Sequence, residues 1–354
     1  MGEHYICTFP HQLLTHYQDW EEWVHITEIT VGTPPQNFRV LLGISDSDIF
    51  LPSSHCDSTC REHRQYQSSL SSTYVANGTH LIGDYLRFTA QGIISQDTVR
   101  VAGIELTNLT FGEAETFWRR QGDLGNDYWD GILGLAPAKH SNNRPYSGEL
   151  DNPFLSIASR GLLDRNVFGL KLSRGLGHPG EIMFGEINHD LYQGELKTLP
   201  LLNDTKDLQV IQGRWIVPAT SISIGDGSAS LEGYAATLES DFPLIALPWD
   251  FVTLLEKYLG MERKGDRYAP KSIDCSKREE LEDFTITLGG HDFVITPFDY
   301  TIEINKKEWG GHRCISAFIG MPNMIKEKYV IIGSSFLRAF YGVFDLDERT
   351  VSCE

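Results

Sequence analysis

Two short acidic turns are the parts of this sequence whose residue types could do chemistry. Residues 43–48 (GISDSD) follow one apolar run, and residues 239–241 (ESD) follow a run of small and apolar residues. A carboxylic acid buried in such a turn can act as a general acid or base. Asp46 and Glu239 are the carboxyl groups of interest in these two turns, although the simpler interpretation makes Asp46 and Asp48 solvated turn carboxylates.

Short β-strands are the elements that would position these turns. Runs of β-branched and aromatic residues recur between Gly, Pro, Asn and Asp, as in VHITEITV, VRVAGIEL and FTITLGG, which predicts an all-β protein. Two stretches that begin near Pro153 and Pro248 have the apolar spacing of short amphipathic helices. An apolar-apolar-Gly element occurs twice, as GILGLAP and as YVIIGSSFL, each after an acidic turn. This order predicts an internal duplication, with an N-terminal β lobe over residues 1–187 and a C-terminal β lobe over residues 188–354.

The composition argues against several classes of partner. The 354 residues include 48 acidic and 30 basic side chains, which gives a formal charge of −18. No basic excess exists to neutralise phosphate, so neither nucleic acid nor an anionic membrane surface is an expected partner. No apolar run approaches the ~18 residues of a transmembrane helix, and no signal peptide is visible. We expect a monomer without a membrane span.

Cysteines and glycosylation sequons favour the secretory pathway. The six cysteines have no second Cys or His pair at zinc-ligand distance, so disulfides in an oxidising compartment are the better interpretation, and neither a metal nor a cofactor is expected. Cys7 and Cys353 lie near the two termini and either pair with each other or stay free. Sequons predict glycosylation at Asn77, Asn108 and Asn203.

Nearly the whole chain resembles a pepsin-family aspartic protease, most closely the fungal vacuolar type. The matching stretches include EITVGTPPQNF, SSLSSTYVANGT, GIISQDTV, DGILGLAP, CISAFIGM and FLRAFYGVFDL. The resemblance implies a bilobal all-β fold with a central cleft, two catalytic Asp residues that face each other, and a hairpin flap over them. It also implies the disulfides Cys56–Cys60 and Cys275–Cys314.

The catalytic motifs of that family are not kept. Each family turn carries Asp-Thr-Gly, whereas the matching positions here read GIS at residues 43–45 and ESD at residues 239–241. Asp46 falls where the family turn has a serine. Tyr85 falls at the flap tyrosine, but residues 86–88 (LRF) replace the glycine-rich flap tip. The family mechanism needs two acids that share one proton, and losing one member of a catalytic set costs ~10⁴–10⁶ in rate. We therefore expect a pseudo-protease.

The favoured hypothesis is a proteolytically inactive pepsin-fold protein whose cleft binds a small organic ligand, such as a fungal biosynthetic intermediate. Glu239, Asp46 and Tyr85 would supply acid–base chemistry for a condensation, isomerisation or cyclisation, if the protein is an enzyme. A ligand pocket is mostly apolar with a few polar groups. The expected lining is Gly43, Ser45, Phe50, Phe88, Ser240, Asp241 and Phe242.

Two alternatives remain open at this level. The first is a peptide- or protein-binding pseudo-protease that does not cut, because the cleft of this family binds extended chains through backbone hydrogen bonds. The second is a residual acid endopeptidase that pairs Asp46 with Glu239. Either protein would reside in the vacuole or be secreted.

Overall fold

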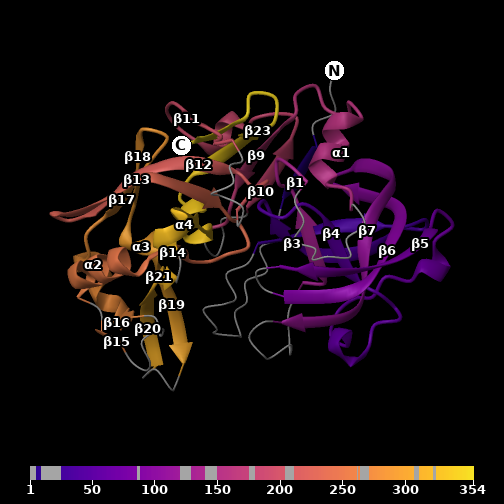
Figure 1. Ribbon diagram of the computed structural model, residues 1–354, viewed down its shortest axis with the longest axis horizontal. Coiled ribbons are helices and arrows are strands. Elements are labelled where there is room, and N and C mark those ends of the chain that lie inside the picture. Colours follow the sequence, from indigo (N-terminus) through magenta and orange to yellow (C-terminus); the bar gives the residue numbers. More distant parts are fainter. Residues whose placement is uncertain are drawn as a thin grey trace. The chain divides into compact units, whose positions relative to one another are not determined.

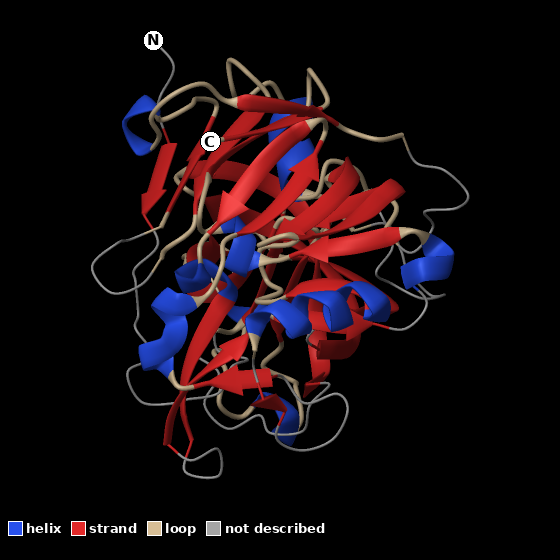
Figure 2. Cartoon of the chain, turned by 90° about the vertical axis from the view of Figure 1, so that its left-hand side faces the viewer, coloured by secondary structure: helices blue, strands red, loops and turns tan. Residues whose placement is uncertain are grey.

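The computed structural model groups the chain into two compact units (Figure 1). Unit 1 comprises residues Met1–Pro10, His25–Asn166 and Ile182–Glu186, and unit 2 comprises the rest. Strands predominate over helices (Figure 2), which confirms the predicted all-β fold class. The boundary between residues 187 and 188 stays a prediction. The residues that the structure describes are 5–8, 25–85, 88–119, 129–139, 150–174, 180–203, 211–260, 262–263, 271–306, 311–321 and 324–354.

A seven-stranded sheet forms the body of unit 1. Its strands follow the order β2-β3-β8-β4-β7-β6-β5, and β2 also pairs with β6. The apolar residues of the central strands are fully buried, among them Leu42, Phe50 and Leu133. The bounds are β2 Ile26–Val31, β3 Gln36–Gly43, β4 Ile49–Pro52, β5 Val75–Asp84, β6 Phe88–Val101, β7 Ile104–Arg119 and β8 Gly131–Gly134; β1 (Tyr5–Thr8) and most of β10 (Glu181–Phe184) also belong to unit 1.

Unit 2 contains a second seven-stranded sheet, in the order β18-β17-β12-β13-β22-β14-β21. The bounds are β12 Ile216–Ile224, β13 Gly227–Leu238, β14 Ile245–Pro248, β17 Phe284–Leu288, β18 His291–Ile295, β21 Phe318–Met321 and β22 Tyr329–Ile332. A smaller sheet has the order β15-β16-β20-β19, with β15 Glu262–Arg263, β16 Lys271–Ile273, β19 Thr301–Lys306 and β20 Gly311–Ser316. The remaining strands pair in the order β9-β23-β24-β11, with β9 Val167–Lys171, β11 Lys197–Pro200, β23 Tyr341–Asp345 and β24 Thr350–Cys353.

Helices are short, and both predicted ones are present. Helix α1 (Pro153–Ser159) has Pro153 in its first turn, and the Asn152 side chain caps it by accepting a hydrogen bond from the Leu155 amide. Helix α2 (Trp249–Leu259) begins after Pro248 and ends at Gly260, whose left-handed backbone suits glycine. The others are α3 (Pro297–Tyr300), α4 (Met324–Glu327) and α5 (Ser334–Leu337).

Each unit contains the same three-strand arrangement, which agrees with the predicted duplication. In unit 1, β8 runs parallel to β3 and antiparallel to β4. In unit 2, β22 runs parallel to β13 and antiparallel to β14. Gly43 lies opposite Gly134 at the end of β3, and Leu238 lies opposite Ile332 at the end of β13. Glu239, the residue after Leu238, therefore holds the position relative to β22 that Gly43 holds relative to β8.

Two glycines let backbone pack directly on the acidic turns. A Cβ atom on Gly134 would lie 2.4 Å from the Asp48 amide nitrogen and 2.6 Å from the Asp46 carbonyl oxygen. A Cβ on Gly333 would lie 2.1 Å from the Leu244 carbonyl oxygen. No side chain fits at either position unless the turn moves. These residues therefore fix where the two acidic turns sit in their sheets.

We expect Gly134→Ala to lower the free energy of unfolding by about 1–3 kcal/mol, because the added methyl group overpacks the turn against backbone atoms that cannot rotate away. Urea unfolding measures the change. Ser159→Ala, on the exposed end of α1, is the matched control and should stay within about 0.5 kcal/mol. An unfolding midpoint unchanged by Gly134→Ala would contradict the tight contact.

Candidate functional site

Backbone hydrogen bonds from the segment around β8 hold the first acidic turn. The Gly134 amide donates to the Asp48 carbonyl at 2.8 Å, and the Ala136 amide donates to the Asp46 carbonyl at 2.8 Å. The carboxylates do not lie in water, because Asp46 is 4% exposed and Asp48 is 1% exposed. The interpretation of both as solvated turn carboxylates is therefore wrong. Ser45 is buried as well.

The Asp46 side chain fills the space that a residue 43 side chain would need. A Cβ on Gly43 would lie 2.5 Å from Asp46 Oδ2 and 3.1 Å from Ile132 Cδ1. Gly43 itself offers only backbone atoms. The turn therefore does carry a carboxylate beside residue 43, but it comes from the residue three positions later.

Tyr85 links the β5–β6 hairpin to this turn. Its amide donates to the Phe88 carbonyl at 2.8 Å, and its hydroxyl donates to Asp48 Oδ1 at 2.7 Å. Burial, and then the charge of Asp48, raise the pKa of Tyr85 well above its ordinary value, so the phenol keeps its proton and remains a donor. Leu86 and Arg87, the substituted flap tip, lie outside the described residues.

Phe50 and Phe88 belong to the core of unit 1. Both are fully buried. The Tyr85 ring stacks on Phe88 with centroids 4.4 Å apart, and Phe88 stacks on Phe117 at the same separation. Phe50 meets Tyr85 edge to face at 6.0 Å. These contacts are ordinary core packing, so a role in lining a ligand pocket stays a prediction for both phenylalanines.

In the second acidic turn, strand β13 delivers Glu239. The Glu239 amide donates to the Ile332 carbonyl at 3.0 Å, and the Ser334 amide donates to the Phe242 carbonyl at 2.7 Å. Ser240 and Asp241 are buried, and Phe242 is nearly so. As in the first turn, an apolar-apolar-Gly strand supplies the backbone that holds the acidic segment.

Glu239 forms a buried ion pair with Arg214. The Arg214 Nη1 atom donates to Glu239 Oε1, and the glutamate side chain is 1% exposed against 19% for the arginine. Burial raises the pKa of Glu239 from 4.5 to about 7, and the charge of Asp241 acts in the same direction, while Arg214 opposes both. Glu239 is thus a carboxyl group that exchanges its proton near neutral pH, next to a fixed cation.

Sequence reasoning missed two members of these clusters. Asp48, to which the sequence analysis gave no functional role, accepts the hydrogen bond from Tyr85. Arg214 is the second, and only the observed β12–β13 register, which puts Ile216 opposite Thr237, brings it level with Glu239. The expected Asp46–Glu239 pair and the central cleft involve residues of both units and stay predictions.

Both predicted disulfides, Cys56–Cys60 and Cys275–Cys314, are present. Cys353 is buried and is not in a disulfide, and burial raises the pKa of its thiol to about 12. The Cys7 side chain lies outside the described part of the chain. The three sequon residues are exposed, and their glycosylation stays a prediction: Asn77, Asn108 and Asn203.

Within the described ranges, one group of side chains has the composition and spacing of a metal site, namely Cys275, Glu303 and His312. It lies in unit 2, and its cysteine is part of a disulfide. The acidic turns contain no such group among the described residues. Among the described residues, none of the helices is long and apolar enough to cross a membrane.

Comparison with known proteins gives consistent matches along the chain. The family model described as eukaryotic aspartyl protease matches residues 24–353. Vacuolar protease A of Aspergillus fumigatus is 36% identical over 332 residues, covering 92% of this chain and 77% of that protein. Vacuolar protease A of Neurospora crassa is 34% identical over 330 residues, with the same two coverages. Cathepsin D of Dictyostelium discoideum is 34% identical over 343 residues, covering 94% of this chain and 83% of its own length.

We expect Gly43→Asp alone to lower the free energy of unfolding by about 1–3 kcal/mol, because the new side chain meets the Asp46 carboxylate in space already filled. Gly43→Asp combined with Asp46→Ser should recover most of that loss, because serine lacks the carboxylate that fills the space beside residue 43. Thermal unfolding of the three proteins measures the coupling. If the two changes add independently, Asp46 does not occupy the place of a residue 43 side chain.

A second prediction concerns pH. The pKa of Glu239 is about 7 in the folded chain and 4.5 at its ordinary value, so the folded chain holds this proton more tightly. The resulting stabilisation of the folded chain is complete at pH values below 4.5, the pKa of Glu239 in the unfolded chain, and it is lost as the pH rises through 7. Relative to Glu239→Gln, the wild type should therefore lose stability over this window, by at most about tenfold in the unfolding equilibrium per pH unit.

Urea unfolding of the wild type and Glu239→Gln at several pH values tests the sign. Asp190→Asn, an exposed carboxylate of unit 2, is the control and should leave the pH dependence unchanged. If the wild type instead gains stability over the variant as the pH rises, Arg214 outweighs burial and the pKa of Glu239 is lowered.

Proposed function

Because the chain belongs to the eukaryotic aspartyl protease family, we propose that it keeps the fold of that family but does not work as an acid endopeptidase. It binds a small organic ligand, such as a fungal biosynthetic intermediate, and Glu239 is the acid–base group that acts on this ligand. The observation that carries the proposal is the buried ion pair of Glu239 with Arg214.

The ion pair supports a loss of peptide hydrolysis. An aspartic protease needs two carboxyl groups that share one proton, so that one activates water while the other donates to the scissile carbonyl. One oxygen of Glu239 is already bound by a guanidinium, and its side chain is one methylene longer than aspartate. Gly43 has no carboxylate at all. Neither turn therefore offers an aspartate carboxyl group at the position where the family reaction needs one.

The same features support acid–base chemistry on a smaller molecule. A general acid or base works best when its pKa lies near the operating pH, and burial brings the pKa of Glu239 to about 7. Perturbed carboxyl groups of this kind gather at functional sites. Arg214 lies beside the carboxylate and adds a positive charge that could stabilise an enolate or another oxyanion as it forms. Condensations, isomerisations and cyclisations that begin with proton abstraction next to a carbonyl pass through such species.

Residual acid endopeptidase activity is the second candidate, and the position of Asp46 favours it. Asp46 Oδ2 lies 2.5 Å from the place of a Gly43 Cβ, so this turn still has a buried carboxylate next to residue 43. An Asp46–Glu239 pair would then replace the family pair. It would have to work with a carboxylate that approaches from a new direction and with a glutamate already bound by arginine.

A vacuolar or secreted location is part of the proposal. Proteins named vacuolar protease A are among the relatives of this chain. Two disulfides and three exposed sequons agree with passage through the secretory pathway, where disulfides form and persist. The acidic composition would keep such a protein soluble.

Two measurements test the function. The purified protein should not cleave denatured globin between about pH 3 and 6, the range in which Asp and Glu titrate. Cleavage that disappears in both Asp46→Asn and Glu239→Gln would overturn the proposal and establish the second candidate.

Native mass spectrometry of the protein isolated from the organism that makes it provides the second measurement. We expect a bound small molecule, retained in Glu239→Gln because the amide can still donate a hydrogen bond, whereas turnover of that molecule should be abolished in the variant. Peptides in place of a small molecule would overturn the proposal in favour of a peptide-binding role. Undiminished turnover in Glu239→Gln would remove Glu239 from the chemistry.

A further inference from the structure

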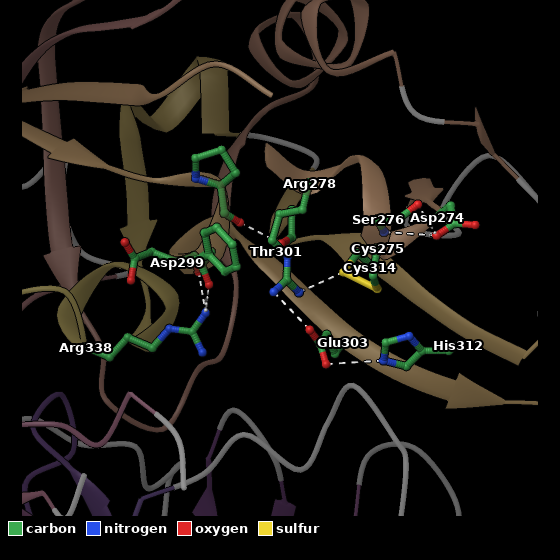
Figure 3. A network of polar contacts seen from close by, with 12 residues as sticks. Asp274, Cys275, Ser276, Arg278, Asp299, Thr301, Glu303, His312, Cys314 and Arg338 are labelled. Atoms are coloured by element: carbon green, nitrogen blue, oxygen red, sulfur yellow. Dashed lines mark hydrogen bonds and ion pairs between the residues drawn. A yellow bond between two sulfur atoms is a disulfide. The ribbon is translucent and has the colours of Figure 1, made fainter. Parts of the chain in front are cut away.

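A polar cluster in unit 2, far along the chain from both acidic turns, surrounds the disulfide Cys275–Cys314 (Figure 3). Cys275 begins a short 3₁₀ segment, Cys275–Glu280. Glu303 lies on β19 directly opposite Cys314 on β20, and His312 lies two residues before Cys314. Side chains two residues apart on a strand share one face. The sheet therefore presents the Glu303 carboxylate, the His312 imidazole and the Cys314 sulfur on the same side, and the disulfide brings Cys275 to that side as well.

The side chains of Cys275, Glu303 and His312 have the spacing of metal ligands. One ligand atom from each of Cys275, Glu303 and His312 lies within 4.8 Å of the other two. His312 Nε2 is 3.3 Å from Glu303 Oε2. Zinc bonds nitrogen and oxygen at about 2.0–2.1 Å in a tetrahedral arrangement, which separates neighbouring ligand atoms by about 3.3 Å. In the structure these two atoms are hydrogen-bonded to each other, and a zinc ion bound between them would replace that contact at nearly the same separation.

In the oxidised protein the sulfur is not available. Cys275 is bonded to Cys314, and a disulfide sulfur lacks the thiolate charge by which cysteine binds zinc. We propose that Cys275, Glu303 and His312 form a zinc site that opens when the Cys275–Cys314 disulfide is reduced. Three protein ligands would leave the fourth position to water. This site is separate from the proposed function of the acidic turns.

Arg278 prepares the disulfide for that reduction. Its Nη2 atom donates to Cys314 Sγ at 2.7 Å, and its Nη1 atom lies 3.0 Å from Glu303 Oε1 (Figure 3). Cys314 is fully buried, whereas Cys275 is partly exposed. A thiolate that attacks Cys275 would expel Cys314 as a thiolate next to the guanidinium. A leaving thiolate stabilised in this way speeds the exchange.

A dithiol supplies both electrons. Its first thiolate forms a mixed disulfide with Cys275 and releases the Cys314 thiolate; its second thiolate then attacks the sulfur of the reductant, so that Cys275 is released as a thiolate and the dithiol departs as its own disulfide. Zinc takes the place of the proton that Cys275 would otherwise bind. The charges then balance, because two thiolates and the Glu303 carboxylate face a divalent cation and the Arg278 guanidinium.

The variant Cys314→Ser tests the metal site without any reductant, because it frees Cys275 and leaves Glu303 and His312 in place. Co²⁺ is the probe, since a thiolate-bound tetrahedral cobalt ion has a charge-transfer band in the near ultraviolet and strong visible bands. We expect these bands in Cys314→Ser and their loss on addition of an equivalent of Zn²⁺. The oxidised wild type should lack them, and should gain them after reduction with a phosphine and its removal.

Matched variants make the assignment specific. Adding His312→Ala to Cys314→Ser should weaken cobalt binding by more than about tenfold, whereas adding His291→Ala, an exposed histidine of the same unit, should not. Cys275→Ser frees Cys314 instead and should lack the charge-transfer band. Each protein is first shown to unfold cooperatively. A folded Cys314→Ser protein without the band, or one whose binding survives His312→Ala, would overturn the site, and equal binding by the oxidised wild type would overturn its link to the disulfide.

Discussion

A carboxyl group that leaves water must be matched by a cation, a donor or a proton, and this constraint governs both acidic turns. In unit 1, Asp48 accepts a hydrogen bond from the Tyr85 hydroxyl, which links the β5–β6 hairpin to the turn. In unit 2, Glu239 accepts a hydrogen bond from the Arg214 guanidinium. Asp48 and Glu239 thus each have a partner within their own unit. The partners are of different kinds, a neutral phenol and a guanidinium cation, so the two turns differ in their electrostatics.

The frame itself does not depend on these acids. Strands β8 and β22 hold the turns through backbone hydrogen bonds, and Gly134 and Gly333 allow backbone to pack where a methyl group would not fit. Such contacts use main-chain atoms, which are the same whatever the side chains of the turn. Because of this separation between the support and the chemical groups, the pairing of the surrounding strands does not depend on which side chains stand at residues 43 and 239.

Local features of the sequence were enough to predict the fold class, the repeated strand arrangement and both helices, whereas both disulfides were predicted from the resemblance to the family. Strand periodicity, Pro at a helix start and the repeated apolar-apolar-Gly element are all encoded by neighbouring residues. The Arg214–Glu239 pair could not be predicted in this way. Counting back from the tight turn at Ile224–Gly227 misplaces the partner of Glu239, because the β12–β13 ladder shifts register between Ala219 and Ser221. Nor does the sequence reveal that the Asp46 carboxylate occupies the space beside residue 43, because that depends on how the turn folds in three dimensions.

The additional pairing of β2 with β6 has a consequence for how separate molecules meet. Strand β2 is bonded on both sides, by β3 and by β6, so the sheet of unit 1 nearly closes on itself. Within the described part of this sheet, β5 is the strand left with an open edge. Unpaired backbone along an edge is a template on which a second chain can add a strand and start an aggregate. Residues 75–80 of β5 are exposed, and Asn77 is among them. A bulky, hydrated sugar at that asparagine would shield this edge, giving the glycan a protective role that is independent of any reaction the protein carries out.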